Sequence, residues 1–452
     1  MRQLIALLLC AVGALPAFSA DTVPGAPALE AAGRLPLPPP WLEELDALYD
    51  ARIRVPGLEE RRFQPEHWWN IVDPVLAGQR FRIEPLGQSA QGRPLRHVAW
   101  GDGGTSVLLW SQMHGDESTA TMALADLFRF LAEHPAHPVV QRVRAATTLH
   151  FLPIVNPDGA ARFQRRNAQG IDINRDARAL VSPEARALHA LRERVRPAFG
   201  FNLHDQQVGY RAGGSERGTA IALLAPAFNE ARDVDPARAR AIELAVAVRA
   251  VLEPYVGGHI AKWDDTYNPR AFGDLTAGAG VSTLLIESGG IEGDLHKQRL
   301  RKLNFLALVG ALDAIATGSH VGLSRRPYEE LPENGEVWPD LLISGATLAL
   351  PGQAQAKVDV LVDFEDPLLE RGGRVEDIGD LSHARARRVI HADGLYLLPF
   401  PAPDAAPEPR PVAPFLPGRP AYFHLSRDPE GAEIVWTLSG DVDPARPHPL
   451  QR

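Results

Sequence analysis

The 452-residue chain has a single cysteine, few long apolar runs and no large excess of charge of either sign. Its one cysteine, Cys10, lies near the N-terminus, so the rest of the chain has no disulfides and no cysteine ligands for a metal. The formal net charge of -9 comes from 56 acids against 47 bases and is spread along the chain. This charge pattern argues against nucleic acid as a partner. Composition therefore excludes a disulfide-stapled scaffold and a basic nucleic-acid-binding protein.

Residues 1–20 have the pattern of a secretory signal peptide. A basic residue, Arg2, precedes an apolar stretch of about a dozen residues, and small residues precede Asp21. The stretch is too short to span a membrane. Leu9 stands before Cys10, where a lipoprotein signal has a small side chain, so we expect no lipid attachment. The prediction is a periplasmic or secreted protein with no integral membrane segment after signal removal; a buried N-terminal helix is the alternative.

The remaining chain divides into three predicted parts. Residues 21–80 combine a proline-rich leader with two short amphipathic helices, which we expect to wrap around the next domain. Residues 81–318 alternate short, continuous apolar runs with helical periodicity, which predicts an α/β domain with a mixed, largely parallel sheet and helices on both faces. Residues 319–452 alternate with a period of two, which predicts a small β domain that includes a proline-rich linker.

Polar side chains follow the ends of several predicted strands. His114 and Glu117 follow the run TSVLLW, His204 follows FGFNL, and Glu287 follows STLLI. Ligands of open α/β sheets bind at the carboxyl ends of the strands, so we expect these side chains to meet at one edge. Two histidines and a glutamate, with one position left for water, are typical of a catalytic zinc site. A divalent cation would also compensate the buried carboxylate.

Five motifs in this order, HGDE, NPDG, GIDINRD, NLHD and LLIESGG, resemble those of the zinc carboxypeptidases, the M14 or carboxypeptidase A-like metallopeptidases. The resemblance covers roughly residues 80–318. It implies a zinc carboxypeptidase-like fold, one zinc ion per chain, and hydrolysis of an amide bond next to a free C-terminal carboxylate. It further implies that His114, Glu117 and His204 bind the zinc and that Glu287 is the general base that takes a proton from zinc-bound water.

The same resemblance assigns side chains to the substrate. It implies that Asn174 and Arg175 hold the C-terminal carboxylate, that Arg165 polarises the scissile carbonyl, and that Tyr267 caps the bound substrate. An arginine fork fits a carboxylate in a bidentate manner, and zinc lowers the pKa of its bound water to about 7. Physical chemistry therefore agrees with these roles. Arg166 remains an alternative to Arg165.

We also expect roles for several other residues, on fewer observations. Asp172 resembles the acid that orients a zinc-ligand histidine through its other ring nitrogen. Asp205 is left open between such a role and simple solvation, and His150 is expected to be a hydrogen-bonded core histidine. The chain departs from the family pattern at Asp116, where pancreatic-type enzymes have arginine, and in NRDAR, which lacks the usual aromatic residue. We therefore expect a different substrate cleft.

Two other functions compete with a metallocarboxypeptidase. The first is a related zinc amidohydrolase that acts on N-acyl amino acids or cell-wall peptides, so the expected partner is a peptide or an N-acyl amino acid. The second is an inactive zinc-fold binding module, and the presence of Glu287 together with all three ligands argues against it. The C-terminal region resembles the small β-sandwich that flanks the barrel of amidohydrolases. Since the barrel and its His-x-His motif are missing, this resemblance implies no second activity.

Overall fold

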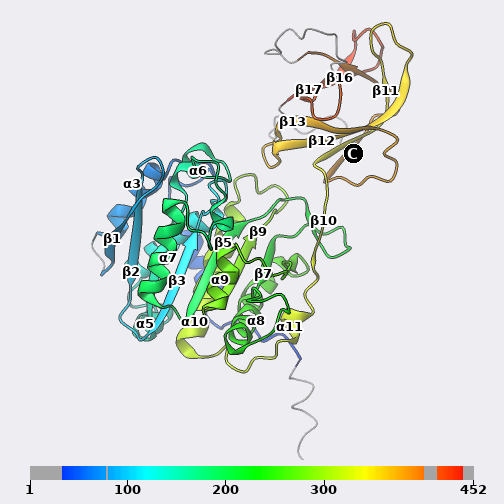
Figure 1. Cartoon of the computed structure of the whole chain (residues 1–452). Helices are drawn as coiled ribbons and strands as arrows, with labels where there is room; N and C mark the ends of the chain where they lie inside the picture. The colour runs from blue at the N-terminus through cyan, green and yellow to red at the C-terminus, as the bar shows by residue number, and fades with distance from the viewer. Residues whose placement is uncertain (1–32, 78–79, 402–414, 441–452) are drawn as a thin grey trace, which may run out of the picture.

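The structure, a computed structural model, describes residues 33–77, 80–401 and 415–440. The predicted signal peptide lies outside these residues. Figure 1 shows a large α/β domain and a smaller β domain near the C-terminus. Within the described ranges, no helix combines the length and the apolar character needed to cross a membrane.

Two helical segments precede the sheet. α2 (Leu42–Leu48) continues into a π-helical turn, η1 (Tyr49–Ile53), and α3 (Pro65–Leu76) follows. Proline at the first position of α3 loses no hydrogen bond, because the first N–H groups of a helix have no partner within it. The apolar faces of this segment, with Leu45 and Trp68 fully buried, join the main core of the α/β domain.

The centre of the α/β domain is an eight-stranded sheet. Its strands are β1 (Arg82–Gln88), β2 (Pro94–Trp100), β3 (Thr105–Ser111), β4 (Thr147–Leu152), β5 (Phe199–Asp205), β7 (Ile221–Leu224), β8 (Ile260–Lys262) and β9 (Ser282–Ser288). They lie in the order β1-β2-β4-β3-β5-β9-β7-β8. The pairs β4–β3, β3–β5, β5–β9 and β7–β8 are parallel, and β1–β2, β2–β4 and β9–β7 are antiparallel. The predicted mixed, largely parallel sheet is confirmed.

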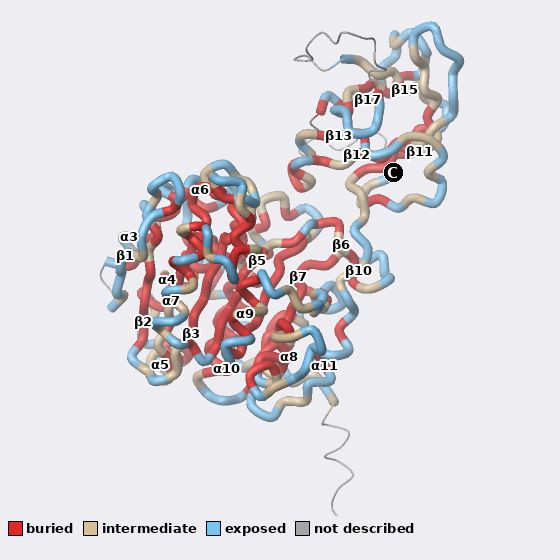
Figure 2. Tube along the Cα trace, viewed as in Figure 1, coloured by how far each residue is buried: buried red, intermediate tan, exposed pale blue. Residues whose placement is uncertain are grey.

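Helices cover both faces of this sheet. Alternate residues of β3 point to opposite faces, so Val107 and Leu109 belong to one hydrophobic core and Leu108 and Trp110 to another. The first face is covered by α4 (Thr119–Glu133), α5 (Pro138–Ala146), α8 (Pro236–Val256) and α10 (Gln298–Thr317), and the second by α7 (Pro183–Val195) and α9 (Phe272–Gly278). Figure 2 shows the central strands as buried, which explains why their sequences are continuously apolar.

The β domain is a seven-stranded sheet with its own core. Its strands are β11 (Leu341–Leu348), β12 (Ala356–Asp366), β13 (Arg371–Gly379), β14 (Arg388–His391), β15 (Tyr396–Pro399), β16 (Tyr422–Ser426) and β17 (Ile434–Ser439). Leu341, Val360, Val375 and Phe423 are fully buried in this core. The β16–β17 pair is antiparallel, as expected for the last predicted hairpin.

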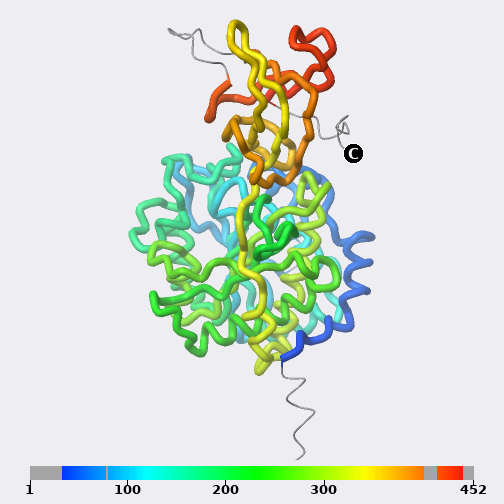
Figure 3. Tube along the Cα trace, turned by 90° about the vertical axis from the view of Figure 1, so that its right-hand side faces the viewer, coloured from blue at the N-terminus to red at the C-terminus, as the bar shows by residue number. Residues whose placement is uncertain are grey.

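The segment between the two domains stays attached to the α/β domain. α11 (Arg326–Glu329) packs against α8, and β10 (Asn334–Val337) pairs with β6 (Tyr210–Ala212) in an antiparallel arrangement. Figure 3 shows this segment running along the α/β domain to the β domain, which lies at one end of it.

Candidate active site

The carboxyl ends of β3, β5 and β9 open into one cleft with a volume of about 960 Å³. His204 on β5 and Glu287 on β9 are direct partners in the parallel register, so their side chains leave the sheet at the same level. Ser111, the last residue of β3, pairs with Leu203. The loop that follows β3 therefore brings His114 and Glu117 to the same edge.

This loop can approach its neighbour because residue 115 is glycine. A Cβ atom on Gly115 would lie 2.0 Å from the carbonyl carbon of Gly159, in the NPDG segment. That segment begins α6 (Pro157–Arg162), which Asn156 caps by accepting the N–H of Gly159 at 2.9 Å. The Gly115 N–H donates to the carbonyl of Arg165 at 3.4 Å. The two loops thus hold Arg165 beside His114.

His114, Glu117 and His204 form a buried group whose ligand atoms lie within 4.8 Å of one another. Nδ1 of His114 is 2.7 Å from Oε1 of Glu117, and Nδ1 of His204 is 2.6 Å from Oε2 of the same carboxylate. Two imidazole nitrogens and a carboxylate are the donor set of catalytic zinc sites. These three side chains therefore fit the single zinc ion expected from the sequence.

Asp172 and Arg165 surround this group. Oδ1 of Asp172 is 3.1 Å from Nε2 of His114, and its Oδ2 accepts from Nε and Nη2 of Arg165 at 3.1 and 2.8 Å. Nη1 of Arg165 is also 3.0 Å from Nδ1 of His114, so a cation already contacts the ligand atoms. Arg166 instead donates to the carbonyl of Gly170 at 3.0 Å. Of the two arginines left open by the sequence, Arg165 is the one that reaches the site.

Burial and ion pairing shift the pKa of each member of the group. Burial opposes the charged form of His114, but the carboxylate of Glu117 and the hydrogen bond with Asp172 raise the pKa of His114 to about 9. For Glu117 burial is outweighed by His114 and His204, which hold its pKa well below the usual range. Burial lowers the pKa of His204. A carboxylate that stays ionised next to imidazole nitrogens is a site for a cation.

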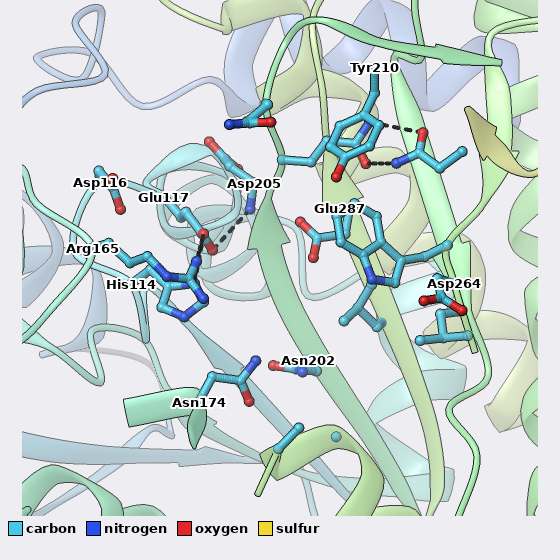
Figure 4. A pocket seen from close by; sticks show the side chains of 18 of the residues that line it. His114, Asp116, Glu117, Arg165, Asn174, Asn202, Asp205, Tyr210, Asp264 and Glu287 are labelled. Carbon is cyan, nitrogen blue, oxygen red and sulfur yellow. Dashed lines mark hydrogen bonds and ion pairs between the residues drawn. The ribbon is translucent and has the colours of Figure 1, made fainter. Parts of the chain in front are cut away.

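Glu287 faces the group from β9, as Figure 4 shows. Burial, and next the charge on Glu117, raise the pKa of Glu287 well above its ordinary value. Its Oε2 atom is buried and has no hydrogen-bond partner within the described part of the chain. A carboxyl group with a raised pKa and a lone pair directed into a cleft is suited to accept and return a proton.

Asn174, Arg175 and Tyr267 also line the cleft. Asn174 and Arg175 belong to a short 3-10 helix, η2 (Ile173–Arg175), which is tied to the loop before α9. The Phe272 N–H donates to Oδ1 of Asn174 at 3.0 Å, and Nη1 of Arg175 donates to the Asn174 carbonyl at 2.8 Å. Every site residue predicted from the sequence therefore lines the cleft or contacts a residue that does.

The cleft also contains Lys297 and Asp274, which the sequence did not single out. Lys297 is buried and forms an ion pair of 3.0 Å with Asp205, which also accepts the Thr119 hydroxyl at 2.6 Å. The Asp205 N–H donates to Oε2 of Glu117 at 3.2 Å and so helps to hold this carboxylate in the metal group, which consists of His114, Glu117 and His204. Asp274 is a further acid in the cleft, and burial raises its pKa to about 6. Since Lys297 is 92 residues from Asp205, no local pattern predicts their pairing.

Residues 76–202 match the family model of the zinc carboxypeptidases (peptidase M14). Carboxypeptidase SOL1 of Arabidopsis thaliana is 28% identical over 102 residues, which make up 21% of this chain and 21% of that protein. The match thus spans about a fifth of the length of that relative. The predicted resemblance to zinc carboxypeptidases is confirmed, and the matched region includes His114 and Glu117 but ends two residues before His204.

Solved structures of carboxypeptidases are also similar to the chain. A metallo-carboxypeptidase from Burkholderia cenocepacia has 20% identity and a TM-score of 0.44, and the match covers 58% of this chain and 70% of that one. A metallo-carboxypeptidase from Pseudomonas aeruginosa, solved with (2-guanidinoethylmercapto)succinic acid, has 18% identity and a TM-score of 0.45, with 58% and 71% covered. Carboxypeptidase A from Helicoverpa armigera has 15% identity and a TM-score of 0.46, with 61% and 80% covered.

Proposed function

We propose that the chain is an exported zinc metallocarboxypeptidase that hydrolyses the last amide bond of a peptide with a free C-terminal carboxylate. One observation carries the proposal: a buried group of His114, Glu117 and His204 shares a cleft with Glu287, which is paired in register with His204. The match to the zinc carboxypeptidase model supports it.

The chain's own residues have distinct tasks in this reaction. His114, Glu117 and His204 would hold the zinc, and Asp172 would keep the Nε2–H of His114 directed away from it. A bound zinc ion supplies a Lewis acid and lowers the pKa of water to about 7. Glu287 accepts the proton of the attacking water and returns it to the leaving amine.

Substrate binding uses the arginines and amide side chains of the cleft. Asn174 and Arg175 pair with the terminal carboxylate, since a guanidinium and an amide N–H₂ both donate to carboxylate oxygens. Arg165 donates to the carbonyl oxygen of the scissile bond, where negative charge develops. Tyr267 lies on the wall of the same cleft, as a cap over the bound residue requires.

Metal content and product analysis test this proposal together. The purified chain should contain one zinc ion, and His114→Ala should lose it, because the affinity of a three-ligand site depends on each ligand. The zinc-loaded chain should release single C-terminal residues from a mixed peptide library. Deacylation of N-acyl amino acids without release of C-terminal residues would instead establish the alternative, a zinc amidohydrolase.

The adjacent arginines provide a matched pair of variants. Arg165→Ala should reduce kcat by about 10²-fold or more, because it removes a donor to the developing oxyanion. Arg166→Ala should leave kcat unchanged, since Arg166 contacts the Gly170 carbonyl instead. Equal losses in the two variants would contradict the role of Arg165.

Export is part of the proposal and rests on the sequence of residues 1–20. Expression of the full chain in a bacterial host should give a mature protein in the periplasm or the medium. N-terminal sequencing should find Asp21 as its first residue, and recovery of uncleaved chain in the cytoplasm would contradict this part.

A further inference from the structure

The tip of the β12–β13 hairpin belongs to the β domain but lies at the cleft of the α/β domain. One wall of the cleft is formed by three residues of the tip and three of the α/β domain: Glu365, Pro367, Leu368, Arg61, Arg62 and Phe163. Leu368 and Leu369 are 6% and 7% exposed, although neither belongs to the core of the β domain. Hairpin tips normally face water, so burial of two leucines here indicates that the tip is part of a contact.

Asp366 attaches the tip to the α/β domain. Its carboxylate is 1% exposed and forms ion pairs with Arg61 and, at 3.1 Å, with Arg62. The same carboxylate accepts the Leu369 N–H at 3.1 Å, which closes the turn of the hairpin. Because the charge is buried, removal of either arginine would leave it poorly compensated. Asp366 and its two arginines are called the latch below.

The latch is connected to the segments that carry the metal group. The carbonyl of Arg61 accepts the Ser118 hydroxyl at 2.6 Å, and Ser118 directly follows Glu117. The guanidinium groups of Arg61 and Arg62 lie 5.0 and 4.5 Å from the ring centre of Phe163, two residues before Arg165. The hairpin tip is thus held against the same two loops that position Glu117 and Arg165.

A second anchor holds the β domain from the linker side. β10 pairs with β6, and Nδ2 of Asn334 donates to Oε1 of Gln206, two residues after His204, at 2.8 Å. Both side chains line the cleft. Since the β domain is attached at the linker and at the latch, it cannot move away from the cleft unless one of these contacts breaks.

Two parts of the cleft wall are held in different ways. In one part Asn174 is tied to Phe272 and Arg175 to Arg270, within the α/β domain. The tip of the hairpin forms part of the wall near Phe163 and Arg165. In Figure 4, Asn174 lies below His114 and Asp116 lies beside Glu117, so both residues are close to the metal group.

We propose that the latched hairpin tip limits substrate length, so that this chain acts on short peptides in preference to long ones. The inference rests on the proposed function, in which the terminal carboxylate binds at Asn174 and Arg175 and the scissile bond lies at the metal group. The rest of the peptide then occupies the remainder of the cleft, which the hairpin tip helps to line, and a longer chain would have to displace the latch. Displacement of such a coupled contact changes affinity typically by about 5- to 150-fold.

The test compares two substrates that share their last two residues, an N-acyl dipeptide and a ten-residue peptide. The wild-type chain should have the larger kcat/KM for the dipeptide. Arg62→Ala should raise the ratio of kcat/KM for the long substrate over the short one by about fivefold or more. The Arg62 side chain is 48% exposed, so its loss leaves no buried cavity. Asp366→Asn should give a rise in the same direction, and Arg62→Lys a smaller one.

Lys357→Ala provides the matched control. Lys357, on β12, pairs with Asp393, in the turn between β14 and β15, but both side chains are 69% exposed and neither lines the cleft. The substrate ratio should not change in this variant. An unchanged ratio in folded Arg62→Ala would overturn the length limit and leave the proposed function intact. Failure of the zinc-loaded wild type to cleave either substrate would overturn the proposed function itself.

Discussion

The α/β domain contains two groups of buried charged side chains, the Arg301–Asp126 network and the metal group, and they differ in how far their hydrogen bonds are satisfied within the protein. Arg301, at 0% exposure, uses all five of its N–H donors: Nε and Nη2 contact the Asp126 carboxylate at 2.7 and 2.6 Å, and the others reach the carbonyls of Leu58 and Val55 and Oε1 of Gln298. At the metal group, by contrast, Nε2 of His204 and Oε2 of the neighbouring Glu287 are buried without a hydrogen-bond partner in the described ranges.

The difference separates a structural role from a chemical one. Asp126 also accepts the Tyr49 hydroxyl at 2.9 Å and the Val55 N–H at 2.8 Å, so this network joins α4, α10 and the N-terminal segment. A charge whose hydrogen bonds are all made within the protein stabilises the fold and has little left to offer a ligand. A buried polar atom without a partner lowers stability and is retained where function needs it. Variants in the two groups should therefore affect different measurements.

The largest effect is expected for Glu287→Gln. Turnover should fall by about 10²- to 10⁴-fold, because the variant cannot accept a proton, while zinc content remains that of the wild type. The free energy of unfolding should not decrease, since a neutral amide replaces a carboxyl group whose Oε2 atom is buried without a hydrogen-bond partner in the described ranges. Steady-state kinetics, elemental analysis and urea denaturation measure the three quantities. Glu292→Gln, at an exposed position nearby, is the control, and near-normal turnover of Glu287→Gln would remove it from the mechanism.

Asp126→Ala should have the opposite result: a loss of stability with unchanged turnover. The free energy of unfolding should decrease by about 3 to 5 kcal/mol, because Arg301 would keep its buried charge without a carboxylate. The protein that remains folded should keep its kcat, since neither residue lines the cleft. Chemical denaturation measures the loss, and the double variant Asp126→Ala/Arg301→Met should lose less than the sum of the single variants. A loss below about 1 kcal/mol would show that the network is not what stabilises this region.

The sequence predicted the metal group because its signals are local. His114, His204 and Glu287 each follow a short apolar run, and parallel strands place such positions at one edge of the sheet. The latch had no such signal, since Arg61 and Asp366 are 305 residues apart and belong to different domains. The choice between Arg165 and Arg166 likewise needed the three-dimensional course of the NPDG segment, because adjacent residues leave a loop in different directions.

Arg175 shares one feature with each of the two groups. It lines the cleft, as Glu287 does, and its guanidinium donates to a backbone carbonyl, as that of Arg301 does. Arg175→Ala should cost about 2 to 5 kcal/mol in kcat/KM for a peptide with a free C-terminal carboxylate. For the amidated peptide, which has no charge to pair, the loss should be much smaller. The two substrates and two proteins form a double-mutant cycle. Arg178→Ala, at an exposed position, is the control, and equal losses on both substrates would favour a zinc amidase or endopeptidase.

A third group, His97 and His150, differs from both of the others because its side chains stay uncharged at neutral pH. Nε2 of His97 is 3.0 Å from Nδ1 of His150, between neighbouring strands β2 and β4. Burial lowers the pKa of both histidines, that of His150 to about 4. Arg194 on α7 and Arg82 on β1 also oppose protonation, and Glu84 on β1 favours it. His150 is thus hydrogen-bonded, as expected, but it is only partly buried and so is not a core residue.

The smallest expected effect is the contribution of His97 and His150 to the pH dependence of the free energy of unfolding. In the unfolded chain both imidazoles are protonated near pH 6.5, whereas in the folded chain they stay neutral to lower pH. Between pH 6.5 and about 4 the unfolded state therefore binds more protons, so the free energy of unfolding decreases as the pH falls through this window. His150→Gln should reduce this decrease by on the order of 1 kcal/mol, after allowance for the partial exposure of His150. Urea denaturation at pH 7 and pH 5 measures it, with the exposed His383→Gln as the control. If wild type and His150→Gln lost the same stability between these two pH values, the pair would not be neutral in the folded protein.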